Sequence, residues 1–118
     1  MAAEYPLILS AVLAAADEHR QAQRLGAAGE LLRQALEVWP KSSAIAARLP
    51  RTSQAVTAEM RQYADRLMEL GLMEYRAGRL ESAIAFWQQT LAIDAAHPGA
   101  RRALDTASLQ LKNLQSLK

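Results

Sequence analysis

The chain has 118 residues, 51% of them hydrophobic and 5% aromatic, and its formal net charge is +2. This length suits one domain, which we expect to span residues 1–118, and so small a charge excess makes no strong electrostatic field. Cysteine is absent, which excludes disulfides and thiolate metal sites but fits the cytoplasm and the periplasm equally well. Abundant Ala, Leu, Gln, Glu and Arg favour helices.

The first expected helix runs from Pro6 to about Arg24, because apolar residues recur along it at helical spacing. Residues 7–16 are apolar enough to resemble the core of a signal peptide. A signal peptide begins with positive charge, however, and Glu4 is the only charged residue before this run. The run is also too short to span a bilayer. We therefore expect a buried first helix, with no signal peptide and no transmembrane segment in this chain.

A second helix is expected between the turn at Gly26 and Pro40, because the residue before a proline avoids the helical region. Ser42 or Ser43 can cap a short helix that continues to Leu49. Thr52 or Ser53 can cap the next helix, which should be the longest and run to about residue 77. Its apolar residues form two stripes about 100° apart, which indicates a helix that packs against two neighbours.

Gly78 is a natural stop for the long helix, and a fifth helix should span residues 80–93. Pro98 can open a last helix over residues 98–117, because proline is tolerated at the first helical position. One face of this last helix is apolar and should pack as a cap on the domain. That face carries Ala100, Leu104, Ala107, Leu111 and Leu114. Leu109 and Leu117 fall outside it.

An internal repeat with a shift of 55 residues relates the second and fifth helices and the helices before them. Small residues fall on small residues and large ones on large ones, as close helix packing requires. The matching pairs are Leu25 and Leu80, Ala28 and Ala83, Leu32 and Trp87, Leu36 and Leu91, Val38 and Ile93, Val12 and Leu67, and Ala16 and Gly71.

At these positions the chain resembles the tetratricopeptide repeat family, in a bacterial-type form. That family stacks 34-residue units of two antiparallel helices. The residues that carry the resemblance are Leu67, Leu70, Gly71, Tyr75, Gly78, Leu80, Ala83, Trp87, Leu91 and Asp94, with Ala28, Leu32, Ala35, Leu36 and Pro40 in the first unit. The aromatic Tyr75 stands one place late, Thr90 replaces a small apolar residue, and the closing proline is displaced to Pro98.

The resemblance implies an all-α fold of antiparallel helical hairpins, with about five to six helices and the last one as a cap. The repeat units would cover residues 9–42 and 64–97, separated by an insertion over residues 43–63. In such a family the first helix of each unit lines a concave surface that binds a peptide or helix of a partner protein. The positions that the resemblance assigns to this surface are Leu13, Asp17, Arg20, Met68, Leu72, Tyr75 and Arg76.

Two alternatives to a peptide receptor stay open. The last helix can itself fill the row formed by Met68, Leu72 and Tyr75. The chain can also self-associate, since Leu109 and Leu117 lie off the packing face and can bury area in a symmetric dimer. A homo-oligomerisation or assembly domain of a larger complex is therefore the second hypothesis.

The sequence offers little reactive chemistry. Its two histidines, His19 and His97, stand in different units without a partner at metal-ligand spacing, so we expect no metal and no cofactor. No glycine-rich loop precedes a helix in a phosphate-binding pattern. The last helix is basic but lacks aromatic stacking platforms, and Arg101 can pair with Asp105, so we expect no nucleic acid partner. We expect a protein that is not an enzyme.

Overall fold

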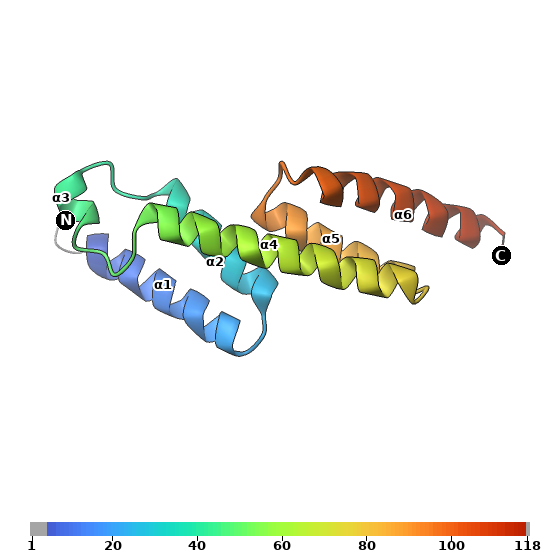
Figure 1. Ribbon diagram of the computed structural model, residues 1–118, viewed down its shortest axis with the longest axis horizontal. Coiled ribbons are helices and arrows are strands. Elements are labelled where there is room, and N and C mark those ends of the chain that lie inside the picture. Colours follow the sequence, from blue (N-terminus) through green and yellow to red (C-terminus); the bar gives the residue numbers. More distant parts are fainter. Residues whose placement is uncertain (1–4, 118) are drawn as a thin grey trace. The chain divides into compact units, whose positions relative to one another are not determined.

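The computed structural model describes residues 5–117, and all the regular secondary structure in that range is helical (Figure 1). The prediction of an all-α fold is therefore confirmed. The helices are α1 (Tyr5–Gln21), α2 (Leu25–Glu37), α3 (Ser43–Ala46), α4 (Ser53–Arg76), α5 (Leu80–Ile93) and α6 (Pro98–Ser116). The fifth helix has the predicted bounds, whereas α1 ends three residues earlier than predicted and α3 ends before Leu49. No helix in the described range is both long and apolar enough to cross a membrane.

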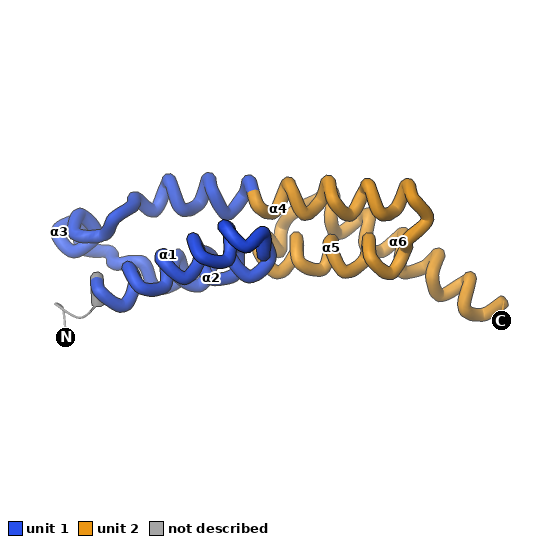
Figure 2. The backbone as a smooth tube through the Cα atoms, turned by 90° about the horizontal axis from the view of Figure 1, so that it is seen from below, with its two compact units in different colours: residues 1–62 blue, residues 63–118 orange. Residues whose placement is uncertain are grey.

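The chain divides into two compact units, residues 1–62 and residues 63–118, which we call unit 1 and unit 2 (Figure 2). The boundary falls inside α4, next to the predicted start of the second repeat at residue 64. Residues 43–62, which the repeat comparison treats as part of an insertion, belong to unit 1. They supply two of its buried residues, Leu49 and Val56.

Unit 1 contains a hairpin of α1 and α2, which are joined by a short turn and pack against each other (Figure 1). The side chains that α1 and α2 bury recur at helical spacing, which explains why these segments form amphipathic helices. They are Leu9, Leu13 and Ala16 on α1 and Ala28, Leu32 and Ala35 on α2. The predicted capping residues begin the next two helices. Ser42 accepts a hydrogen bond from the Ile45 amide (3.4 Å), and Thr52 accepts one from the Ala55 amide (3.1 Å).

Unit 2 contains the C-terminal part of α4, then α5 and α6. Its core is built around Ala83, Trp87 and Ala107, and partly buried side chains of all three helices pack against this cluster. These are Met68, Leu72, Tyr75, Ile84, Ala103 and Leu104. The small residues Ala83 and Ala107 leave room for the indole of Trp87, which is the largest fully buried side chain. Small and large residues therefore alternate here as the repeat pattern predicts.

The two hairpin turns have the same geometry at positions 55 residues apart. Gln23 has φ 65° and Gly78 has φ 82°. The next residues, Arg24 and Arg79, have φ, ψ of −93°, 71° and −91°, 77°. In each turn this arginine also donates from its Nε to a side chain five residues back, His19 in the first turn and Glu74 in the second. The internal repeat is therefore present in the backbone as well as in the sequence.

Candidate functional site

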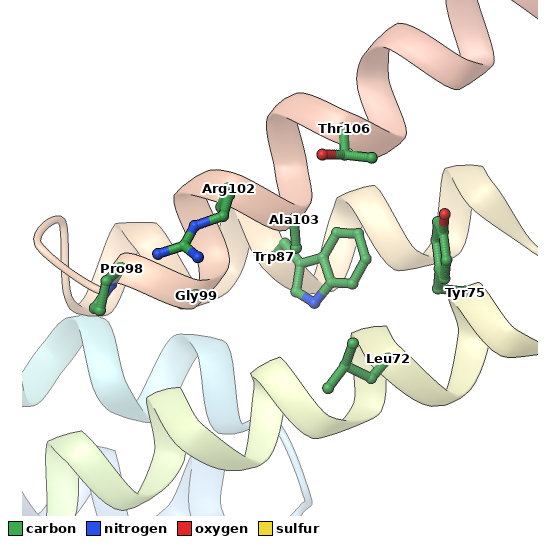
Figure 3. Close-up of a pocket in the computed structure, with 8 residues that line it drawn as sticks. All are labelled: Leu72, Tyr75, Trp87, Pro98, Gly99, Arg102, Ala103 and Thr106. Atoms are coloured by element: carbon green, nitrogen blue, oxygen red, sulfur yellow. The ribbon is translucent and has the colours of Figure 1, made fainter.

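A cavity of about 460 Å³ lies between the three helices of unit 2 (Figure 3). We call it the unit 2 cavity. Its lining comes from the end of α4, the middle of α5 and the first half of α6. The residues that line it are Leu72, Tyr75, Trp87, Pro98, Gly99, Arg102, Ala103 and Thr106. The volume falls in the range of about 300–1,000 Å³ that is usual for ligand pockets.

The inner wall of the unit 2 cavity is aromatic. The rings of Tyr75 and Trp87 are tilted by 41° with centroids 5.8 Å apart, a favourable separation for two aromatic side chains. Trp87 Nε1 donates a hydrogen bond to the backbone oxygen of Met68 at 3.2 Å. Because this bond uses the indole N–H, the inner wall presents carbon and the tyrosine hydroxyl. The cavity therefore suits an apolar group.

Gly71 allows Trp87 to occupy this position. A Cβ atom added to Gly71 would lie 2.6 Å from Trp87 Cδ1 and 2.8 Å from Cε2, and closer still to Nε1. These distances are shorter than carbon contacts allow, so any side chain at residue 71 would displace the indole. The predicted close approach of two helices at Gly71 is confirmed, and it positions the inner wall of the cavity.

The outer rim of the unit 2 cavity belongs to α6 and is open to solvent. Pro98, Arg102 and Thr106 are all exposed, and all three stand on α6 (Figure 3). Arg102 is the only charged residue in the lining. Within residues 5–117, no ion pair joins Arg102 to a carboxylate. The expected pair between Arg101 and Asp105 is not formed there either, since no oxygen of Asp105 lies within ion-pair distance.

His97 positions the α6 end of the cavity. Its Nδ1 accepts a hydrogen bond from the Ala100 amide at 3.1 Å and so caps the first turn of α6. Its Nε2 lies 3.2 Å from Asp65 Oδ1 on α4. Because Nδ1 accepts, the neutral ring carries its proton on Nε2 and donates it to Asp65. Sequence reasoning placed His97 only in a turn, since its link to Asp65 joins residues 32 positions apart.

The structure brings together three of the predicted partner-binding residues. Met68, Leu72 and Tyr75 lie on one side of α4 and pack against the core of unit 2. Leu72 and Tyr75 line the unit 2 cavity, and Met68 lies beneath Gly99, within 3.6 Å of the position a Cβ atom would take. Arg76 is exposed and stands outside the lining. The last helix therefore covers part of the row formed by Met68, Leu72 and Tyr75, in line with the first alternative. The unit 2 cavity lies beside the covered part.

The predicted partner-binding residues of the first repeat have different surroundings from those of the second. Leu13 is 1% exposed and belongs to the core of unit 1, so its placement on a binding surface is corrected. Asp17 and Arg20 form an ion-pair cluster with Arg51 and Glu59. Arg51 bridges Asp17 and Glu59, and Arg20 lies 3.9 Å from each acid. Charged side chains that pair with one another in this way are less available for ion pairs with a partner protein. The sequence could not show this cluster, because Arg51 lies 34 residues from Asp17.

Leucines on α6 form a second surface. Leu109 is 59% exposed and Leu117 83% exposed, which fits their predicted position off the packing face. Leu114 was expected on that face but is 52% exposed. Leu114 instead borders a shallow pocket beside the α4–α5 turn, together with Leu111 and residues 78–82. The end of α6 runs past this turn in both views (Figures 1 and 2).

No family model matches this chain, and the comparisons with curated proteins and with solved structures found no match either. The tetratricopeptide resemblance therefore stays a prediction. Within the described residues, no group of three or more His, Asp or Glu side chains gathers as metal ligands would.

Proposed function

We propose that this chain is a non-catalytic protein interaction module of the tetratricopeptide type, and that the unit 2 cavity is where it binds a peptide or helix of a partner protein. One observation carries the proposal: an apolar, aromatic-walled cavity opens to solvent at a place where Leu72 and Tyr75 are expected to face a ligand. Apolar side chains of a partner gain most when they enter such a preformed cavity, because water is excluded from both surfaces.

The capture of partners by a variant with a filled cavity tests this proposal. Substitution of Met68 or Tyr75 would also disturb the core, so Thr106→Phe is the better choice, since Thr106 is exposed and its new ring can enter the cavity. Ser108→Phe is the matched control, because it adds the same exposed ring about 200° around α6. We expect the tagged wild-type chain and Ser108→Phe to capture the same proteins from the source organism, and Thr106→Phe to lose them.

Capture that survives Thr106→Phe unchanged would refute the assignment of the cavity. The same experiment addresses self-association, the second candidate, which the exposure of Leu109 and Leu117 favours. If the chain assembles with itself through α6, a tagged copy will recover an untagged copy, and serine at both leucines will abolish the recovery. Failure to recover an untagged copy at high concentration would remove this candidate.

A further inference from the structure

The unit 2 cavity combines an apolar interior with a single charge at its mouth, and this combination bears on what enters it. The interior surface comes from Leu72, Tyr75, Trp87 and Ala103. The one charged lining residue, Arg102, stands on α6, and its guanidinium group extends toward Pro98 at the start of that helix (Figure 3). A group that fills the cavity therefore places whatever is attached to it next to a cation.

The neighbouring charges leave that cation uncompensated. On the α4 part of unit 2, Asp65 lies beside His97, Glu69 pairs with Arg66 at 3.0 Å, and Glu74 pairs with Arg79. No carboxylate pairs with Arg102 among the residues that the structure describes, although Asp105 follows it by three positions on the same helix. A guanidinium group without an acidic neighbour is the preferred partner of a carboxylate, which it binds through two parallel hydrogen bonds.

Because the rim is open, we favour a peptide chain as the ligand, since one chain can supply both the apolar group for the cavity and the carboxylate for Arg102. Because Pro98, Arg102 and Thr106 are exposed, a chain can place one side chain in the cavity and continue along α6 in either direction. The volume of about 460 Å³ accommodates a large apolar side chain with part of its backbone. An enclosed cavity would instead suit a small molecule that is wholly buried.

We propose, building on the function proposed above, that the ligand is an acidic segment of a partner protein. In this segment a large apolar side chain fills the unit 2 cavity, and a carboxylate close to it in sequence pairs with Arg102. The apolar contact supplies most of the affinity, and the charge pair selects among apolar segments by rejecting basic ones.

The test is a selection of displayed random 12-residue peptides on the wild-type chain and on Arg102→Glu. Wild type should enrich peptides in which Asp or Glu lies near Trp, Phe, Leu or Met. Arg102→Glu should enrich Lys or Arg in place of the acid. Synthetic fluorescent copies of the wild-type peptides should bind Arg102→Glu about tenfold more weakly, since an attraction becomes a repulsion. Arg101→Glu is the matched control, with the same change in net charge one residue away and outside the lining, and should lose less than about twofold.

The outcomes separate this inference from the function on which it rests. If Thr106→Phe abolishes binding but Arg102→Glu binds the same peptides as tightly as wild type, the acidic ligand is refuted and the cavity remains the binding site. If the selected peptides bind Thr106→Phe normally, or if none is enriched, both proposals fail. Binding of decanoate tests whether the ligand is instead a small amphiphile. If no peptide binds, and decanoate binds wild type but not Thr106→Phe, the assignment of a peptide is overturned.

Discussion

Gly71 and Trp87 show how one pair of residues shapes the unit 2 cavity. The equivalent pair in unit 1 is Ala16 and Leu32, which are 3% and 0% exposed. The first repeat thus holds an alanine and a leucine, both buried, at the positions where the second holds a glycine and a tryptophan in close contact. The two pairs are alternative solutions to the same packing problem, since the summed volume in the gap between helices has to stay nearly constant.

The close packing of residues 71 and 87 predicts a strong energetic coupling between substitutions at these two positions. Gly71→Ala should lower the free energy of unfolding by about 1–3 kcal/mol, because the new Cβ collides with the indole and disturbs the bond from Trp87 Nε1 to Met68. Trp87→Leu should cost about 2–4 kcal/mol through the space that it leaves. The double variant should be at least about 1 kcal/mol more stable than the sum of the two effects. Urea denaturation followed by circular dichroism measures all three.

Gly99→Ala provides the control for this cycle. A Cβ atom at residue 99 would have ordinary contacts, 3.5 Å from His97 Cε1 and 3.6 Å from Met68 Cε, so this change should cost less than about 0.5 kcal/mol. Additive effects of Gly71→Ala and Trp87→Leu would show that the two side chains do not compete for one space, and would contradict the account of the inner wall.

At the scale of elements, the two hairpins use the same turn but fill its left-handed position with different residues. Gln23 adopts φ 65° in the first turn and Gly78 adopts φ 82° in the second. A residue with a Cβ atom is strained in this conformation by about 1 kcal/mol, and glycine is not. The first turn therefore contains strain that the second avoids.

Exchange of these two residues should have opposite effects. Gly78→Gln should destabilise the chain by about 1 kcal/mol through backbone strain alone, because no other atom lies within 4 Å of the new Cβ. Gln23→Gly should raise stability by up to about 1 kcal/mol, less the entropy that glycine loses on folding. Thermal melts of the two variants check the prediction. A stabilising Gly78→Gln would show that the shared turn geometry has been misassigned.

The elements themselves could be read from the sequence because their signals are local. Pro98, Gly78 and the caps Ser42 and Thr52 act within a few residues. They fix where α6 begins, where α4 ends, and where α3 and α4 begin. The small residues Gly71 and Ala83 were also placed correctly, since the repeat compares like positions.

The rest of the site depends on contacts between distant residues, which no local pattern contains. Arg102 and Thr106 lie on the polar side of α6, and the predicted cap gave no reason to bring them to a cavity. They border it because α6 packs on α5 and leaves the end of α4 partly open. Leu13 was misplaced for a similar reason. It matches Met68 in the repeat, but it is 1% exposed in unit 1, whereas Met68 is only partly buried in unit 2.

At the scale of the whole molecule, the two units share a hairpin and a turn but offer different surfaces. In unit 1 the side chains of Asp17 and Arg20, which were predicted to bind a partner, form ion pairs with Arg51 and Glu59. In unit 2 the rim of the cavity is open to solvent at Arg102, and behind it lie the half-buried Tyr75 and the buried Trp87. We therefore propose that unit 2 is the part that binds a partner, although the resemblance distributed the binding residues over both repeats.

A titration of the ¹⁵N-labelled full chain with one selected peptide, followed by amide and indole resonances, tests this assignment most directly. We predict that the largest shifts fall on the Trp87 indole N–H and on the amides of Leu72, Gly99 and Ala103, with little change in unit 1. Shifts centred on Leu109 and Leu117, or on Asp17 and Arg20, with the Trp87 indole unmoved, would contradict the account.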